Sequence, residues 1–200
     1  MIEIKNIFKS FGKSEVLNDI SAKFERGKTN LIIGQSGSGK TVLLKCLLGL
    51  YSIDQGELIY DSIYSSKMND EEKINIKKDM GMVFQGSALF DSLTVLENVR
   101  FPLDMLTKYS EKKKNEIALK FIDRVNLNDA INKLPSEISG GMQKRVGIAR
   151  AIVLNPKYLF CDEPNSGLDP KTAIVIDNLI QEITKEYNIT TVINSHDMNS

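Results

Sequence analysis

The sequence predicts an α/β fold in which helices flank a mostly parallel sheet. A glycine-rich loop, 34–41, joins an apolar strand to a helix. Short apolar runs at 80–84, 158–163 and 190–194 alternate with helical patterns, as buried parallel strands do. Polar side chains follow each of these runs, and such side chains meet at the carboxyl edge of a parallel sheet. We therefore expect the functional chemistry at that edge.

Length and composition predict a single domain, 1–200. The chain has 42% hydrophobic and 26% charged residues, enough for one sizeable core. Lys plus Arg (26) balances Asp plus Glu (26), so no net field favours nucleic acid, and we expect no nucleic-acid partner.

Cys46 and Cys161 are predicted to be buried, reduced thiols. The start lacks a secretion signal and no stretch approaches the ~20 apolar residues of a membrane helix, which predicts a cytoplasmic protein or one held at a membrane by other subunits.

The N-terminal quarter predicts antiparallel strands followed by a phosphate-binding loop. Residues 2–8 and 16–25 alternate apolar and polar side chains around a turn at 11–13. Phe11 in that turn is suited either to stacking on an adenine ring or to covering a sheet edge, and the local pattern leaves both open. A strand at 29–33 and a buried helix at 42–48, ending at Gly49, enclose the loop.

The loop itself satisfies the pattern G-x-x-x-x-G-K-[ST]. Its glycines let successive backbone N–H groups turn inward, next to the positive end of the following helix. Lys40 is placed to reach the β- and γ-phosphates, and the Thr41 hydroxyl is a candidate Mg²⁺ ligand. The predicted phosphate-binding residues are Gly34, Gln35, Ser36, Gly37, Ser38, Gly39, Lys40 and Thr41.

The middle of the chain provides two weaker candidates. A strand at 57–60, a polar surface segment at 61–78 with a short helix, and a buried strand at 80–84 lead to Gln85. Gln85 is a candidate for sensing Mg²⁺ or the attacking water, or it simply begins a loop. An amphipathic helix is predicted at 111–126. Ser139 then caps another helix, and Gly140 and Gly141 expose N–H groups to an anion, although an ordinary capped helix has the same pattern.

The last quarter places acids and a histidine at strand ends. The strand 158–163 ends in Asp162, a candidate for the Mg²⁺ shell, and Glu163, which is placed to polarise water. A turn-rich loop at 164–170 and a helix with an apolar stripe follow. The strand 190–194 delivers His196, the single histidine, toward the edge where a γ-phosphate would lie.

Taken together, in this order and spacing, these residues resemble an ABC-type ATPase along essentially the whole chain. Residues 34–41 look like Walker A, Gln85 like the Q-loop, and 139–141 like the core of the signature motif. The stretch 159–162 looks like Walker B, 166–169 like the D-loop and His196 like the H-loop switch. The resemblance implies that Glu163 is the catalytic glutamate and that Phe11 is the aromatic residue that stacks on adenine.

The resemblance also implies a fold, cofactors and partners. We expect a P-loop NTPase of ABC type, with an N-terminal antiparallel β subdomain and a helical subdomain at about 86–155. Such an ATPase uses ATP and Mg²⁺ and works as a homodimer, in which 139–141 of one subunit closes over the nucleotide of the other. Hydrolysis then separates the halves and moves a permease. The expected contact surface for that permease is 86–106, although Phe90, Leu93 and Phe101 fit a helical core equally well.

Finer features resemble the ATPases of Mla-type, MCE-associated phospholipid transport. The fifth signature residue is Met142 rather than glutamine, and 86–103 is also similar to that group. An MlaF-like subunit would imply an integral-membrane, MlaE-like permease, an indirect MCE-domain lipid-binding partner, and a place on the cytoplasmic face of the inner membrane. Asn165 stands where many relatives have threonine or another residue. The chain stops four residues after His196, where relatives continue, so the resemblance implies a truncated C-terminal end.

Three other functions remain open. The first is an ABC ATPase for lipoprotein release or small-solute import, which Met142 alone argues against. The second is a soluble ABC ATPase acting on DNA or ribosomes, although the long coiled coils, zinc motifs and tandem halves typical of these proteins are absent. The third is a P-loop kinase or GTPase, which would leave 139–141 and His196 unexplained.

Overall fold

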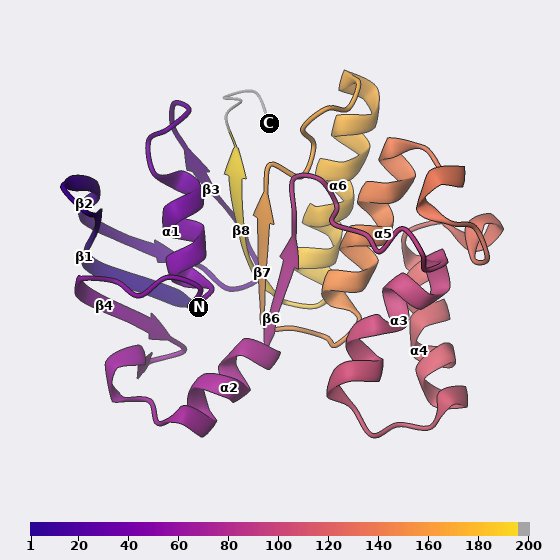
Figure 1. Ribbon diagram of the computed structural model, residues 1–200, viewed down its shortest axis with the longest axis horizontal. Helices are drawn as coiled ribbons and strands as arrows, with labels where there is room; N and C mark the ends of the chain where they lie inside the picture. Colours follow the sequence, from indigo (N-terminus) through magenta and orange to yellow (C-terminus); the bar gives the residue numbers. More distant parts are fainter. Residues whose placement is uncertain (196–200) are drawn as a thin grey trace.

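The computed structural model describes residues 1–195, and two sheets organise them (Figure 1). The first is antiparallel, in the order β2-β1-β4-β5. Its strands are β1 (Ile2–Phe11), β2 (Ser14–Phe24), β4 (Gln55–Tyr60) and β5 (Ile63–Tyr64). Strand β1 buries Ile2 and Ile4 by the alternation of a pleated strand. Ile7 is also buried, because the register shifts between Ile4 and Ile7.

The second sheet is wholly parallel, in the order β3-β8-β7-β6. Its strands are β3 (Thr29–Ile33), β6 (Met80–Val83), β7 (Tyr158–Asp162) and β8 (Thr190–Ser195). The two central strands, β7 and β8, are buried almost throughout, as expected for strands covered on both faces. Among the described residues β3 forms an edge, where Leu31 and Ile33 are 44% and 49% exposed.

Helices cover the parallel sheet on both faces (Figure 1). They are α1 (Lys40–Leu47), α2 (Asp70–Lys78), α3 (Val95–Leu106), α4 (Glu111–Arg124), α5 (Gly140–Ile152) and α6 (Pro170–Glu186). Helices α3, α4 and α5 pack together on the side of the molecule away from the antiparallel sheet. Within the described residues, none of these helices is long and apolar enough to cross a membrane.

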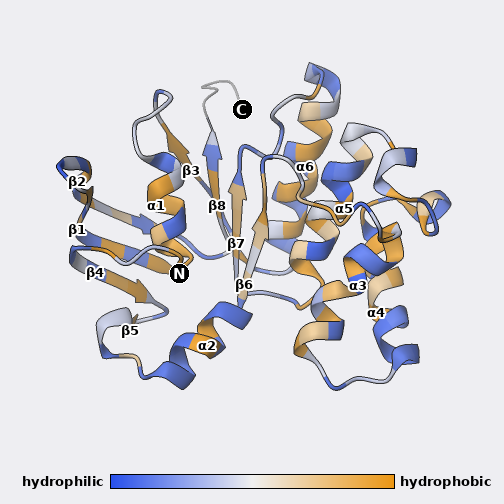
Figure 2. Cartoon of the chain, viewed as in Figure 1, coloured by the Kyte–Doolittle hydropathy of each residue, from blue (hydrophilic) through white to orange (hydrophobic). Residues whose placement is uncertain are grey.

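Two hydrophobic cores lie on opposite faces of the parallel sheet. Along β7, Tyr158 and Phe160 face the core shared with α1 and the antiparallel sheet, whereas Leu159 and Cys161 face the core under α3 to α6. This period of two is what a pleated strand imposes. Hydropathy follows the same layers, with apolar residues along the strands and the inner helix faces (Figure 2). The predicted α/β architecture is confirmed.

Helix α3 is the one long element that the sequence analysis did not predict. Pro102 lies inside it and obscures the helical pattern, since proline removes a backbone donor. A usable signal was nevertheless present. Thr94 caps α3 by accepting a hydrogen bond from the Glu97 N–H, and the Glu97 carboxylate accepts one from the Thr94 N–H in return. This is the capping box that the spacing S/T-x-x-E predicts.

Candidate functional site

The glycine-rich loop folds around the amine of Lys40, the first residue of α1. Lys40 is 7% exposed, and its Nζ donates to the carbonyl oxygens of Gly34 (2.7 Å) and Gln35 (2.8 Å). Gly39 adopts a φ of +91°, and a Cβ there would lie 2.9 Å from the Val16 carbonyl oxygen. A larger residue would therefore clash with the antiparallel sheet. The loop forms a polar cradle with a buried cation at its base, which suits a polyphosphate.

The hairpin that carries Phe11 lies beside this cradle. The Phe11 ring is 44% exposed and meets the Tyr51 ring edge-on, with centroids 5.3 Å apart. The Lys9 amine lies 5.3 Å from the Phe11 ring centroid. Phe11 is therefore a partly open aromatic surface near the loop, and adenine stacking there stays a prediction.

Three strand ends bring the polar candidates together. At the end of β7, Asp162 Oδ1 accepts a hydrogen bond from the Thr41 hydroxyl at 3.4 Å. Just after β6, Gln85 Nε2 donates to Glu163 Oε2 at 3.0 Å and to Ser166 Oγ at 3.3 Å. Glu163 has a φ of +46°, a conformation that costs free energy in a residue with a side chain and often marks functional sites. Residues up to 122 positions apart in sequence thus converge at one edge.

The donor set fits a magnesium nucleotide better than a protein-only metal cage. Within residues 1–195, no group of three or more His, Cys, Asp or Glu residues is arranged to hold a metal ion. Mg²⁺ is usually held by one or two protein oxygens together with substrate phosphates and water. The hydroxyl of Thr41 and the carboxylate of Asp162, next to the phosphate cradle, supply such oxygens.

The second helix end that is predicted to bind an anion lies elsewhere in the chain. Ser139 caps α5, and its Oγ accepts from the Met142 N–H at 3.3 Å. Gly141 has no room for a side chain, since a Cβ would lie 2.6 Å from Thr172 on α6. Residues 35–38 of the loop and the residues Ser139 and Gly140 are exposed. His196 lies outside the described residues.

Comparison with known proteins shows the family of this chain. The sequence profile described as ABC transporter matches residues 17–166, three quarters of the chain. The chain belongs to the ABC transporter family. Proteins of this family bind ATP with Mg²⁺, and the chain contains an ABC ATPase domain.

Named relatives are transport ATPases. The chain is 38% identical over 198 residues to the probable ribonucleotide transport ATP-binding protein mkl of Mycobacterium leprae, covering 99% of this chain and 57% of mkl. It is 41% identical to the methionine import ATP-binding protein MetN of Clostridium tetani, covering 99% and 62%. It is 37% identical to the L-cystine import ATP-binding protein TcyC of Bacillus subtilis, covering 99% and 81%. The chain thus spans less than two thirds of mkl and MetN.

Solved structures show the same fold. The dimeric bacterial ABC transporter cassette MJ0796 superposes with a TM-score of 0.87 at 34% identity, covering 100% of this chain and 89% of that one. A second MJ0796 structure, a dimer in a post-hydrolysis state with ADP and Pi, gives a TM-score of 0.86 at 33% identity, with the same coverage. CbiO1 of Clostridium perfringens, part of the complex cbiONQ, gives 0.89 at 27% identity and covers 98% and 78%.

The ABC ATPase domain also uses residues that the sequence analysis missed. Two cations of α5 hold the loop after β6: Lys144 Nζ donates to the Gln85 carbonyl oxygen, and Arg150 donates to those of Ser87 (2.7 Å) and Ala88 (2.8 Å). Burial lowers the pKa of both Lys144 and Arg150. The available signal was a pair of basic residues on the buried stretch of a helix. Asn194, an amide within an apolar strand, was also missed.

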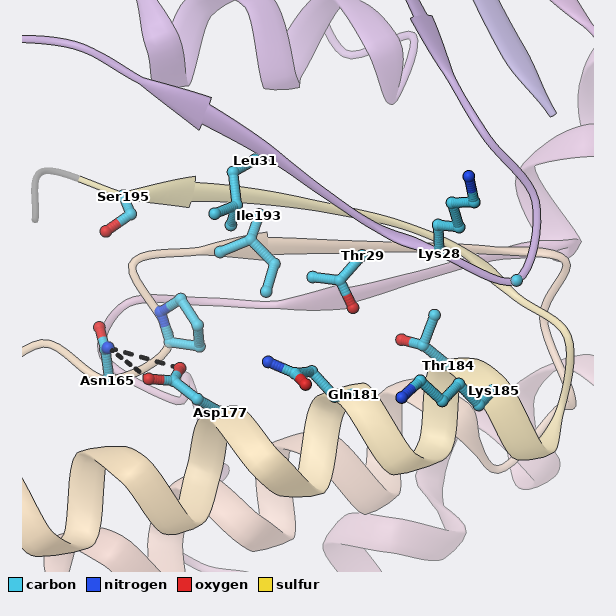
Figure 3. Close-up of a pocket in the computed structure, with 12 residues that line it drawn as sticks. Lys28, Thr29, Leu31, Asn165, Asp177, Gln181, Thr184, Lys185, Ile193 and Ser195 are labelled. Atoms are coloured by element: carbon cyan, nitrogen blue, oxygen red, sulfur yellow. Dashed lines mark hydrogen bonds between the residues drawn. The ribbon is translucent and has the colours of Figure 1, made fainter. Parts of the chain in front are cut away.

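Two hollows flank the site. A groove of about 290 Å³ lies between β6 and α3 and is lined by Phe84, Phe90, Phe101 and Leu106 among others; the Phe90 and Phe101 ring centroids lie 4.5 Å apart. A pocket of about 360 Å³ lies between the strand edge and α6. There Asn165 Nδ2 donates to both carboxylate oxygens of Asp177, at 3.2 and 3.4 Å (Figure 3).

Proposed function

We propose that this protein is the ATP-hydrolysing subunit of an ABC transporter. The convergence of Thr41, Gln85, Asp162 and Glu163 at one sheet edge carries the proposal. Glu163 acts as the base that orients or deprotonates the attacking water. The Gln85 amide holds the Glu163 carboxylate at 3.0 Å and so fixes its direction before substrate arrives.

The phosphate and metal contacts follow from the same geometry. Lys40 exchanges the two loop carbonyls for phosphate oxygens, while the loop N–H groups of 34–39 take the remaining charge. Thr41, Gln85 and Asp162 would hold Mg²⁺, which would supply positive charge to offset the charge of the phosphates. We assign His196 to the γ-phosphate and Phe11 to adenine on the family resemblance.

In this proposal the active form is a homodimer, because the signature segment 139–141 covers the nucleotide of a second subunit. Ser139, Gly140 and Gly141 present a helix N-terminus, which attracts anions. In the single chain, this helix end packs against Thr172 and Leu168 rather than against the loop 34–41. A second subunit brings it over the nucleotide, so ATP joins the subunits and hydrolysis releases them.

The groove between β6 and α3 is the proposed contact for an integral-membrane permease. It is lined by half-exposed aromatic residues from 84–101, and it begins at the Gln85 loop that senses the nucleotide. Helices α3 to α5, about 86–155, act as the helical subdomain that moves with that partner. The subunit would then lie on the cytoplasmic face of the inner membrane.

For the transported substrate, the relatives favour small-solute import. MetN and TcyC are named for methionine and L-cystine import, and mkl for ribonucleotide transport. The names of these relatives do not support phospholipid transport. That second candidate rests on two resemblances in the sequence. The Ile138-Ser139-Gly140-Gly141-Met142 signature and the segment 86–103 are both similar to Mla-type ATPases, which have MCE-domain and MlaE-like partners.

The hydrolytic proposal is tested by Glu163→Gln in the full-length protein. We expect ATP hydrolysis to fall at least about 100-fold while ATP affinity stays within a few fold of the parent, because only the proton acceptor is lost. The matched control is Glu182→Gln, an exposed glutamate on α6 that pairs with Arg124. Hydrolysis by Glu163→Gln at the parent rate would contradict the assignment.

The substrate is decided by affinity purification of the full-length protein from its native membrane. A permease recovered with an amino-acid or other solute-binding protein would support import. A permease recovered with an MCE-domain protein and phospholipid would support the second candidate. A soluble nucleic-acid or ribosomal partner would contradict transport altogether.

A further inference from the structure

Asn194 is a buried amide placed between two residues of the magnesium site. It lies on β8, fully buried, directly opposite Asp162 in the register of β7 and β8. Its Nδ2 donates to Asp162 Oδ1 at 2.6 Å and to Thr41 Oγ1 at 3.2 Å. Since a carboxylate oxygen can only accept, the atom near Asp162 must be the amide nitrogen, which settles the orientation of the amide.

These bonds determine how the Thr41 hydroxyl is used. The hydroxyl has one proton and two lone pairs. Its proton points to Asp162 at 3.4 Å, and one lone pair accepts from Asn194. One lone pair therefore remains for a metal ion, with the hydroxyl held in a single rotamer. The same amide also holds Asp162 Oδ1, so that one side chain orients both proposed metal-site oxygens.

The arrangement has a cost in stability. Asn194 Oδ1 is buried and, among the described residues, has no hydrogen-bond partner. An unsatisfied buried acceptor costs about 1–3 kcal/mol, and the neighbouring strand residues Val192 and Ile193 show that this strand accepts apolar side chains. An apolar residue at 194 would avoid that penalty. The reason for an asparagine here is therefore the pair of hydrogen bonds that its amide nitrogen donates to Thr41 and Asp162.

We propose that Asn194 is a positioning residue for the magnesium nucleotide, acting through Thr41 and Asp162. The inference rests on the proposed assignment of those two residues to the Mg²⁺ shell and is independent of the transported substrate. Loss of a hydrogen-bond partner behind a metal ligand typically weakens metal affinity 10- to 100-fold. Asn194 therefore governs how much Mg²⁺ the site requires, rather than how tightly the loop holds phosphate alone.

The test is Mg²⁺-dependent nucleotide binding by the full-length protein. Binding of a fluorescent ATP analogue is measured in EDTA and across a MgCl₂ titration. Asn194→Leu keeps the size of the side chain and removes both hydrogen bonds. We expect affinity in EDTA within about twofold of the parent, whereas the Mg²⁺ concentration for half-maximal tightening rises at least about 10-fold. Parent Mg²⁺ dependence in Asn194→Leu would overturn the inference.

Two further variants separate the possible failures. Thr190→Val removes a second buried oxygen, Thr190 Oγ1, that has no hydrogen-bond partner within residues 1–195. It lies at the opposite end of β8, and the variant should keep parent Mg²⁺ dependence. Asp162→Asn tests the metal-site assignment: if its Mg²⁺ dependence is unchanged, that assignment fails and the inference fails with it. If only Asp162→Asn has an effect, the inference alone fails.

If Asn194→Leu does not fold, the replacement variant is Asn194→Val, whose β-branched side chain is suited to a strand. It provides the same measurement.

Discussion

At the scale of single residues, Asp177 combines partial burial with a side-chain hydrogen-bond partner, Asn165. It lies half-buried on α6, at the pocket of Figure 3, and accepts two hydrogen bonds from Asn165. Burial raises the pKa of the Asp177 carboxyl, and the hydrogen bonds from Asn165 offset this only in part. Asn165, whose sequence context gave no indication of its role, thus anchors the loop that follows Glu163.

The raised pKa predicts a pH-dependent gain in stability for Asp177→Asn. The folded protein binds a proton here more tightly than the unfolded chain, so this contribution to stability is present at acid pH and is lost as the pH rises through the folded pKa. Asparagine keeps an oxygen for Asn165 but carries no charge. We expect Asp177→Asn to melt about 1–3 °C above the parent at pH 7, with the difference vanishing toward pH 4.

Thermal unfolding of the full-length protein at several pH values checks this expectation. Asp129→Asn, at an exposed position, is the matched control and should leave the melting temperature nearly unchanged at every pH. A parent that is more stable than Asp177→Asn at pH 7 would show that the charged carboxylate is favourable here, contrary to the burial argument.

Site residues were predictable where a motif fixes their spacing and not where the fold brings them together. Lys40, Thr41, Asp162 and Glu163 follow from local patterns. The hydrogen bond between Gln85 and Glu163 joins residues 78 positions apart and depends on β6 lying beside β7. Asn194 reaches Thr41 only because β8 lies beside both β3 and β7, a strand order that the sequence pattern does not specify.

At the scale of elements, α5 organises two loops through two arginines. Arg150 binds the carbonyl oxygens of Ser87 and Ala88, whose backbones have φ values of +61° and +47°. Arg145 binds those of Val125 and Asn126 at the end of α4, both at 3.1 Å. The bidentate contact from Arg150 supports a loop whose left-handed conformations cost free energy on their own.

Arg150→Leu should therefore loosen the segment that follows Gln85. Two carbonyl oxygens lose their partner, and we expect a loss of about 1–3 kcal/mol in the free energy of unfolding. Hydrogen exchange should become faster across 85–90 than elsewhere. Arg145→Leu is the control from the same helix, and its loss of protection should fall at 124–128 instead. Equal protection of 85–90 in both variants would contradict this account.

A hydrophobic period predicted several elements, but α3 was missed although Val95, Val99 and Leu103 give it a buried face at helical spacing. The central strands and helices α4 and α6 follow from apolar spacing alone. Helix α3 carries Pro102 in its interior, and the packing of α3 against α4 and α5 outweighs that local penalty. The secondary structure of such a segment is determined by tertiary contacts, which a local sequence pattern does not contain.

At the scale of the whole molecule, the proposed nucleotide site is divided between two separate segments of each chain. The loop residues 35–38, which precede α1, and the residues Ser139 and Gly140, which begin α5, are exposed. Each segment lies at a helix N-terminus, which attracts anions. A two-fold dimer in which each half faces the other subunit's complementary half satisfies both at once. The solved cassette MJ0796, a relative of the same fold, is a dimer.

This arrangement predicts ATP-dependent cross-linking between two engineered cysteines. Ser38→Cys and Ser139→Cys, combined with Glu163→Gln in the full-length protein, place exposed thiols on the two halves. With ATP, a short bifunctional maleimide should join two subunits, because the signature segment of one closes over the loop of the other.

The native Cys46 and Cys161 are fully buried, and burial raises the pKa of both thiols, so they should not react. Either cysteine substitution alone should give no covalent dimer, since a two-fold axis sets 38 opposite 139 and not opposite itself. Equal cross-linking with and without ATP, or none with ATP, would contradict a dimer closed by nucleotide.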